Sequence, residues 1–428
     1  MKMKRTWPWV CASVLCLLTL PPVFSVLWNP AVDHHPRPEE QRADRGELVR
    51  LAGYPVLRLR GSPYERGYQH GLLLRAEVRA NVQGFLSYIY KEFPLGQYGT
   101  QALLDYAYGR FRPYIPTSYQ EEMQGLADGA GLPLRDIHRV HAAPELFELR
   151  GLVSCASFAA FGRATVDGRL YHIRNLDWIF QAGVQRYPLL LVYPEDGIVN
   201  IGYAGFLGVI SGMNRAGISL GQIGATSRDW TLRGLPMPFL LRRVLEEAGT
   251  LEDAARIVRT APRTVGHNYV IASGKEGRAI ALETTHSLCV LFTDDREGTL
   301  DYAFPVTDVL YRADPALSPQ VRRWQTCSNG YPNPPTGGRA YEVRYRKQGE
   351  LLQRYHGQIT PEVARAIARA IAPPSNIQSV IYSPSTLEFW VANADTTTRA
   401  AERPYQHFSF SELLGSSQEE LWQEASSS

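Results

Sequence analysis

A long succession of short β-prone runs constrains this chain more than any other feature of its sequence. After Val153 the runs ASFAAF, RLYHI, PLLLVYP, IVNIGYAG, GVISGMN, GISLGQIGA, NYVIAS, AIALETT and LCVLF follow one another, separated by turn-forming residues. Helical patterns interrupt them at PFLLRRVLEEA, TLEDAARIVRTA and TPEVARAIARAIAPP, where Thr250 and Thr360 are cap candidates. Because strands and helices occur in separate runs and do not alternate, we predict an α+β layered fold.

A mainly helical segment precedes these strands. Apolar residues recur at three- and four-residue spacing in YERGYQHGLLLRAEVRANVQGFLSYIYKEF, and Ser118 is a cap candidate for SYQEEMQGLADGAGL. The chain has 428 residues, of which 44% are hydrophobic, so it can bury a sizeable core. We divide the folded part into a helical segment, 49–154, and a sheet-rich domain, 155–428.

The N-terminus has the pattern of an export signal. Lys2, Lys4 and Arg5 precede an apolar run, 7–28, so we expect residues 1–28 to direct the protein out of the cytoplasm. The run is also long enough for a membrane anchor, although Pro21 and Pro22 interrupt it as a helix. Cleaved (periplasmic or extracellular) and anchored forms both remain open. Residues 29–48 are Pro-rich and charged, and we interpret them as a linker.

Charge and cysteine content exclude several function classes. The 45 basic and 42 acidic residues nearly balance, so we expect no nucleic-acid partner. The sequence has no HExxH, phosphate-binding Gly-rich or Cys-x-x-Cys motif, so we expect neither a metal nor a nucleotide cofactor. The three cysteines after residue 28 allow one disulfide, expected between Cys289 and Cys327, which leaves Cys155 as a free thiol.

Cys155 begins a predicted hairpin, SCASFAAFGRATVDGRLYHIRNLDW. The turn near Asp167 and Gly168 returns the second strand toward Cys155, so we expect the Arg174 guanidinium to lie near the sulfur and favour the thiolate. Asp177 follows at a spacing that requires the backbone to bend if both side chains serve one site. The residues alone leave two other interpretations open: Cys155 as a buried small side chain, and Arg174 with Asp177 as a structural pair.

The position of Cys155 also suggests its own base. Cleavage of the Ser154–Cys155 bond would give Cys155 a free α-amino group, whose reference pKa of about 8 suits a general base. One residue would then supply both nucleophile and base, so no catalytic histidine is required. We therefore interpret His172 as a structural residue on its strand.

These motifs resemble those of the isopenicillin N acyltransferase-like family of self-cleaving cysteine enzymes, in the N-terminal-nucleophile hydrolase superfamily. The resemblance rests on GSPYERGYQHG, SYQEEMQGLADGAG, CASFAAFGRATVDGRLYHIRNLDW and GVISGMNRAGISLG, which extend over most of the chain after the signal. It implies a four-layer αββα sandwich, made as a precursor that cleaves itself between Ser154 and Cys155 into two chains that stay associated.

The same resemblance implies the site residues. Cys155 is the nucleophile, and Arg174 and Asp177 steer its amine and thiolate. The family's oxyanion-hole asparagine is missing from the place we match to it, Thr307-Asp308-Val309, where a carboxylate would repel a developing oxyanion. We expect Asn268 to supply the donor instead, with main-chain N–H groups near Gly224 as a further source. Arg312 is a candidate for substrate contact.

From this we predict an exported cysteine amidohydrolase or acyltransferase, which attacks amide or ester bonds of small acyl substrates through an acyl-enzyme on Cys155. One alternative is a lipid amidase or phospholipase-like hydrolase. Another is a catalytically inactive binding module of the cell envelope that keeps the same fold.

Overall fold

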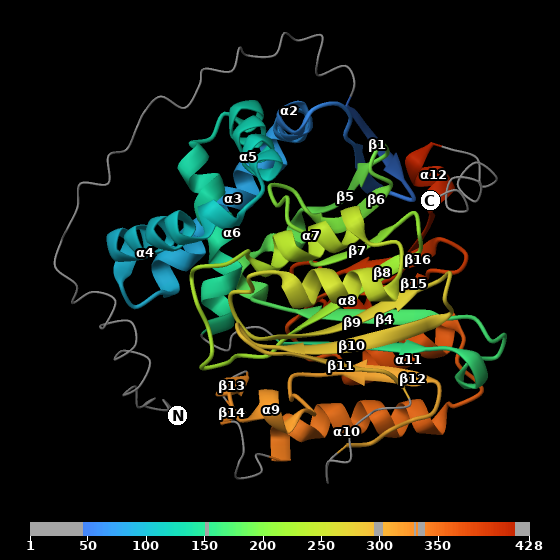
Figure 1. The fold of residues 1–428 in the computed structure, drawn as a ribbon. Coiled ribbons are helices and arrows are strands. Elements are labelled where there is room, and N and C mark those ends of the chain that lie inside the picture. The colour runs from blue at the N-terminus through green and yellow to red at the C-terminus, as the bar shows by residue number, and fades with distance from the viewer. Residues whose placement is uncertain (1–45, 150–153, 295–302, 329–330, 333–338, 416–428) are drawn as a thin grey trace. The chain divides into compact units, whose positions relative to one another are not determined.

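Two large β-sheets lie face to face, with helices on both outer sides (Figure 1). The computed structural model describes residues 46–149, 154–294, 303–328, 331–332 and 339–415. The nine-stranded sheet has the order β1-β2-β5-β6-β7-β8-β9-β10-β11. Its strands are β1 (Glu47–Leu51), β2 (Tyr54–Arg58), β5 (Pro188–Tyr193), β6 (Ile198–Tyr203), β7 (Ser211–Asn214), β8 (Ile218–Gly224), β9 (His267–Ser273), β10 (Arg278–Thr284) and β11 (Cys289–Phe292).

The second sheet has six strands in the order β12-β3-β4-β15-β16-β17. They are β12 (Val309–Arg312), β3 (Ser154–Ala160), β4 (Tyr171–Asp177), β15 (Asn376–Ser383), β16 (Glu388–Asn393) and β17 (Gln406–Ser409). A separate ribbon pairs β13 (Cys327–Ser328) with β14 (Tyr331–Pro332). β3, β4 and β12 of the six-stranded sheet contact β8, β9 and β10 of the nine-stranded sheet, so the two sheets form the inner layers.

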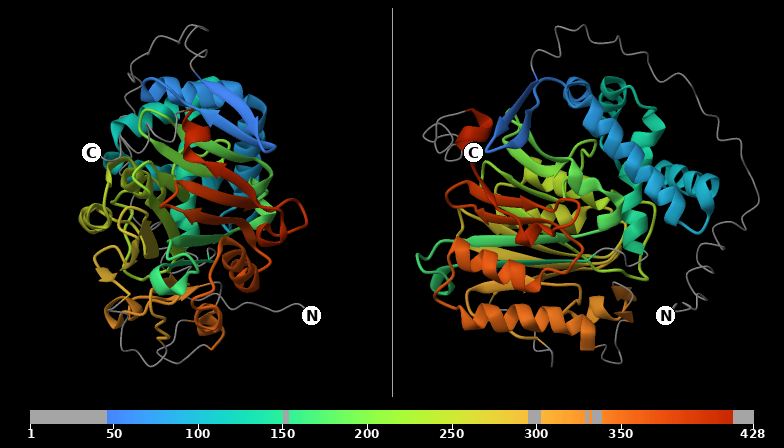
Figure 2. Two further views of the ribbon diagram at one scale, coloured as in Figure 1. Left: turned by 90° about the vertical axis from the view of Figure 1, so that its right-hand side faces the viewer. Right: turned by 180° about the vertical axis from the view of Figure 1, so that it is seen from behind.

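Helices cover both outer faces (Figures 1 and 2). α7 (Met237–Glu247) and α8 (Leu251–Thr260) pack on the nine-stranded sheet, whereas α10 (Arg339–Arg354) and α11 (Pro361–Ile371) pack on the six-stranded sheet. Two short helices, α9 (Pro319–Arg322) and α12 (Phe410–Leu414), complete the part after residue 154. The predicted four-layer αββα sandwich is therefore confirmed.

The N-terminal segment supplies helices and, unexpectedly, two strands. Its helices are α2 (Pro63–Leu73), α3 (Arg75–Glu92), α4 (Gly96–Phe111), α5 (Thr117–Ala130) and α6 (Leu134–Leu149). β1 and β2 belong to the nine-stranded sheet, where β2 runs parallel to β5 with Val56 opposite Leu190. The prediction of a mainly helical segment was thus incomplete, because one edge of the sheet comes from this segment. Short 3-10 turns lie at Arg112–Tyr114, Gly162–Ala164, Phe180–Ala182, Val184–Arg186 and Ala400–Glu402.

Glycines let α2 and α5 pack unusually closely. A Cβ atom at Gly67 would lie 1.9 Å from the Glu122 carbonyl oxygen, and one at Gly125 would lie 2.0 Å from the Tyr64 carbonyl oxygen. Any larger residue at either position would therefore push the two helix backbones apart. This packing gives a physical reason for the glycines of GYQHG and GLADG, which lie in two of the motifs that carry the family resemblance.

The local helix signals had mixed outcomes. Thr250 and Thr360 cap α8 and α11 through their side chains, as predicted. Ser118 does not cap α5, because that helix begins one residue earlier and the conformation of Pro116 sets its start. Leu74 separates α2 from α3 inside the predicted long helical stretch.

The expected disulfide is absent at Cys289. Its thiol is free, and it accepts a hydrogen bond from Arg259 of the neighbouring α8, while the side chain of Cys327 lies outside the described residues. The predicted signal and anchor, 1–28, also lie outside the described residues. Within the described ranges no helix is long and apolar enough to cross a membrane.

Candidate active site

Cys155 lies at the start of β3 and is fully buried in the uncut chain. β3 and β4 are antiparallel, with Cys155 opposite Leu176 and Ser157 opposite Arg174, so the hairpin predicted around these residues is confirmed. The Arg174 side chain reaches diagonally across the pair, and its Nη2 donates to the Cys155 sulfur at 3.5 Å. The structure therefore brings the predicted nucleophile and the predicted cation together.

Asp177 contacts the Cys155 thiol through its main chain, while its carboxylate binds other residues. Arg174 faces the nine-stranded sheet, whereas the Asp177 carboxylate pairs with Arg344 of α10 at 2.6 Å and accepts a hydrogen bond from Asn376 Nδ2 at 3.0 Å. The main-chain N–H of Asp177 also hydrogen bonds to the Cys155 sulfur. The bend expected after Arg174 is therefore unnecessary, because Asp177 acts on the thiol through its backbone and its charge.

Burial dominates the ionisation of the thiol. Loss of hydration raises the pKa of Cys155 to about 11, although the Arg174 charge lowers it and the Asp177 charge raises it further. The thiol is therefore protonated at neutral pH in the uncut chain, and the nearby guanidinium only partly offsets the cost of forming a thiolate.

Sequence reasoning missed two charged residues beside the thiol. Arg344 and Asp314 both interact electrostatically with Cys155, and they also interact with each other. The pairing of β12 with β3, which sets Arg312 opposite Ser157, carries the chain on to Asp314. No local signal predicts this pairing, because 148 residues, 161–308, lie between the two strands. Arg344 lies on α10, a helix that the sequence analysis did not identify.

Two candidate oxyanion donors lie on the nine-stranded sheet. Asn268 is buried on β9, and its Nδ2 donates to the main-chain oxygens of Ala313 at 3.2 Å and Asp314 at 3.3 Å. Gly224 ends β8 and lies opposite His267. In the uncut chain the Asn268 amide is thus engaged with main-chain oxygens, and its role as an oxyanion donor remains a prediction.

Two other candidates lie elsewhere. Asp308 sits at the opposite end of β3 from Cys155, because Val309 pairs with Ala160, and its carboxylate accepts a hydrogen bond from the Arg163 N–H at 2.9 Å. It stabilises the hairpin end, so its match to the oxyanion position was wrong. Arg312 is fully buried in an ion pair with Glu283 at 2.9 Å, and its contact with substrate stays a prediction.

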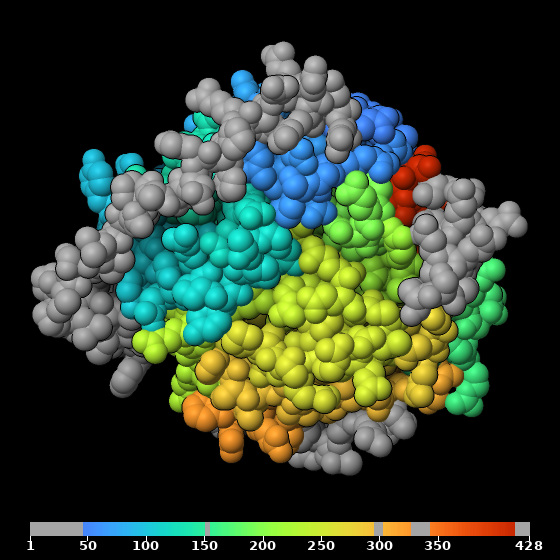
Figure 3. All heavy atoms as spheres, turned by 45° about the horizontal axis from the view of Figure 1, so that its top comes forward, coloured from blue at the N-terminus to red at the C-terminus, as the bar shows by residue number. Residues whose placement is uncertain are grey.

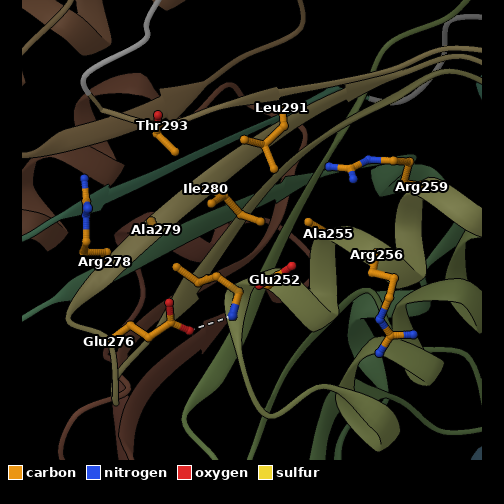
Figure 4. Close-up of a pocket in the computed structure, with 11 residues that line it drawn as sticks. Glu252, Ala255, Arg256, Arg259, Glu276, Arg278, Ala279, Ile280, Leu291 and Thr293 are labelled. Carbon is orange, nitrogen blue, oxygen red and sulfur yellow. Dashed lines mark hydrogen bonds between the residues drawn. The ribbon is translucent and has the colours of Figure 1, made fainter.

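The surface of the uncut chain gives no access to the thiol, since Cys155 has no exposed surface. One pocket, of about 410 Å³, lies between α8 and the strands β10 and β11, where Arg256, Arg259 and Arg278 surround apolar residues such as Ile280 and Leu291 (Figure 4). None of the candidate active-site residues lines it. Among the described residues no group of His, Cys, Asp or Glu side chains could hold a metal ion.

Comparison with known proteins shows what this chain is similar to. Residues 164–300 match the model of the family described as acyl-coenzyme A:6-aminopenicillanic acid acyl-transferase. The match covers 137 of the 428 residues, and over this region the chain is similar to that family. The matched region contains Arg174, Asp177 and Asn268, whereas Cys155 precedes it.

Curated relatives and a solved structure extend the comparison. Protein dcd1B of Dictyostelium discoideum is 27% identical over 264 residues, which are 56% of this chain and 52% of that protein. Acid ceramidase of Rattus norvegicus is 25% identical over 215 residues, 43% of this chain and 52% of the enzyme. The chain thus spans about half the length of these relatives. The Caenorhabditis elegans ortholog of N-acylethanolamine-hydrolyzing acid amidase is 13% identical with a TM-score of 0.39, covering 54% of this chain and 93% of that one.

Proposed function

We propose that this protein is an exported, self-cleaving cysteine amidohydrolase that acts on small acyl amides or esters through an acyl-enzyme on Cys155. The observation that carries the proposal is the position of Cys155. It is the second residue of β3, it follows the helical segment directly, and the Arg174 Nη2 lies 3.5 Å from its sulfur. The export part of the proposal rests on the sequence pattern of residues 1–28.

Self-cleavage would proceed within the site already described. The Cys155 thiol first loses its proton to solvent, and the thiolate attacks the carbonyl carbon of Ser154. Water protonates the departing amide nitrogen, and a thioester forms as the C–N bond breaks. Water then hydrolyses the thioester, which restores the thiol and leaves a carboxylate on Ser154. The former amide nitrogen is now the α-amine of Cys155.

The same atoms then serve the substrate reaction. The α-amine takes the thiol proton, the thiolate attacks the acyl carbonyl, and the protonated amine delivers its proton to the leaving group. Water resolves the acyl-enzyme. The Arg174 charge stabilises the thiolate in both reactions, and Asp177 holds the hairpin end on which Cys155 sits.

A lipid amide is the second candidate substrate class. The similarity to acid ceramidases favours it, because their name describes enzymes that act on ceramide. Hydrolysis of short acyl amides without hydrolysis of long-chain acyl amides would exclude this candidate.

Replacement of Cys155 by alanine tests the proposal. We expect intact mass and N-terminal sequencing to show two chains for the wild type, one of which begins at Cys155, and one uncut chain for Cys155→Ala. Cys289→Ala is the matched control, because Cys289 is a free thiol outside the site, and it should cleave like the wild type. A wild-type protein that stays uncut would refute self-cleavage and favour the inactive binding module.

The raised pKa of Cys155 gives a second prediction. Because only the thiolate attacks and the pKa is about 11, the rate of self-cleavage should rise about tenfold per pH unit between pH 6 and 9. Purified precursor, stopped at intervals and resolved by gel electrophoresis, measures this rate. A rate that does not change over this range would contradict attack by a buried thiolate.

A further inference from the structure

Arg174 has a second polar partner besides the thiol. Its Nη2 donates to Gln222 Oε1 at 3.2 Å, and Gln222 lies on β8, in the sheet that faces the hairpin. Both side chains are buried. A guanidinium carries donors and no acceptor, so the Gln222 amide must present its oxygen to Arg174 and its NH2 group to the other side.

That NH2 group meets His267. Gln222 Nε2 lies 2.9 Å from His267 Nδ1, and because the amide nitrogen is a donor, Nδ1 must be the unprotonated acceptor of the ring. Burial lowers the pKa of His267 to about 3, so the ring is neutral and carries its proton on Nε2. The nearest carboxylate oxygen, on Glu148 of α6, is 3.9 Å from Nδ1, beyond hydrogen-bond distance.

These contacts fix one orientation of the amide. A Gln222 side chain turned by 180° would place its NH2 group against the Arg174 guanidinium and its oxygen against the lone pair of His267 Nδ1. Both contacts would be repulsive, and in a buried site their cost is high. Arg174 and His267 together fix the amide, so His267 supports the orientation in which Gln222 accepts the hydrogen bond from Arg174 Nη2, the atom that touches the thiol.

We propose that Gln222 and His267 are positioning residues of the active site, which together hold the Arg174 guanidinium against the Cys155 sulfur. This inference rests on the proposed function, in which Cys155 is the nucleophile. Neither residue touches the reacting atoms, so both act through Arg174.

Two substitutions of His267 separate positioning from mere packing. Asparagine places an amide oxygen near the δ position of the imidazole, where Gln222 needs an acceptor, whereas glutamine places its amide near the ε position. We expect the precursor with His267→Gln to cleave itself about tenfold more slowly than the precursor with His267→Asn, because only the latter keeps the acceptor. The pH profile of cleavage should move to higher pH in the slower variant.

The melting temperatures of both His267 variants show how much stability the protein loses without the imidazole ring. They are measured with Cys155→Ala added, so that the chain stays uncut. Equal cleavage rates and equal pH profiles for His267→Asn and His267→Gln would overturn the positioning role. A third variant, Gln222→Leu, should also cleave about tenfold more slowly than the wild type, because Arg174 loses the acceptor that holds it. If the wild type itself does not cleave, the proposed function fails, which is a different result from equal rates in cleaving variants.

Discussion

Acidification from pH 7 to pH 5 is expected to destabilise the protein strongly and to loosen its N-terminal segment first. Two histidines of this segment bind the loop after β6: Gly205 N–H donates to His70 Nε2 at 3.0 Å, and Leu207 N–H donates to His141 Nε2 at 3.0 Å. Each ring nitrogen accepts the hydrogen bond through its lone pair, so protonation of either ring would turn the acceptor into a donor and break the link.

The pKa values of the two histidines determine the direction in which stability changes with pH. Burial lowers the pKa of His70 to about 3 and that of His141 to about 4, whereas an exposed histidine titrates near 6.5. The unfolded chain therefore binds protons first, and stability is lost as the pH falls below about 6.5. At pH 5 each ring contributes a loss of about 2 kcal/mol, and buried His172 and His267 add losses of the same sign.

A buried glutamate partly opposes this loss. Burial raises the pKa of Glu145 to about 7, so its burial cost, which is present above the unfolded pKa near 4.5, shrinks as the pH falls through 7. Burial also raises the pKa values of Glu148 and Asp177, which oppose the loss in the same way, whereas burial lowers the pKa of His138 to about 3 and adds to the loss. We expect the five buried histidines to outweigh the three carboxylates. The melting temperature of the uncut Cys155→Ala protein at pH 5, 6 and 7 measures the net effect.

A double variant of the two histidines keeps their hydrogen-bond acceptors and cannot take up a proton. His70→Gln with His141→Gln places amide oxygens where the two Nε2 atoms accept hydrogen bonds, and these oxygens do not titrate. We expect this double variant to lose less stability between pH 7 and pH 5 than its parent. The same loss in both proteins would show that these two histidines do not control acid stability.

Removal of the Arg242 charge is expected to have the second large effect. Arg242 of α7 is fully buried, pairs with Glu122 of α5 at 2.7 Å and lies over the rings of Tyr119 and Tyr193. It is thus a main link between the N-terminal segment and the body, whose surfaces meet in Figure 3. Arg242→Met leaves the Glu122 carboxylate buried without its partner, which costs about 3 to 5 kcal/mol.

The adjacent Arg243 is the control. It forms a similar pair with Glu247 at 2.8 Å, but both side chains are partly exposed, so Arg243→Met should cost less than about 1 kcal/mol. Urea denaturation of the two uncut variants gives these free energies of unfolding. After cleavage, the two chains of Arg242→Met should also separate more readily in size-exclusion chromatography. Equal losses for both arginines would contradict a stabilising role of the buried link.

Local patterns in the sequence predicted the architecture but not its long-range pairings. The strand runs, the caps at Thr250 and Thr360, and the hairpin that joins Cys155 to Arg174 all depend on neighbouring residues, and the structure contains them. The strands β1 and β2 were missed because the partner that joins them to the sheet, β5, pairs with β2 from more than 100 residues later, and β1 is attached through β2. Pairing of that kind depends on tertiary packing, which single-sequence propensity does not report.

The residues of the candidate site also fall into those that local sequence predicts and those that long-range packing brings in. Cys155, Arg174 and Asp177 lie on one hairpin, so their proximity could be predicted from the turn between them. Arg344 and Gln222 reach the site from α10 and β8, and nothing in their local sequence marks them. Asp308 shows the reverse error, since a motif match placed it in the site and the register of β12 places it at the far end of β3.

The mixed origin of the nine-stranded sheet has a consequence for how the protein must be made. β5 is covered along one edge by β2, which lies before the predicted cleavage site. A catalytic chain translated alone from residue 155 would expose that edge, Pro188–Tyr193, as an apolar strand with unpaired backbone groups open to other chains. We therefore expect the N-terminal segment to act as a folding partner for the rest of the chain, and two separately expressed halves should aggregate before they can assemble.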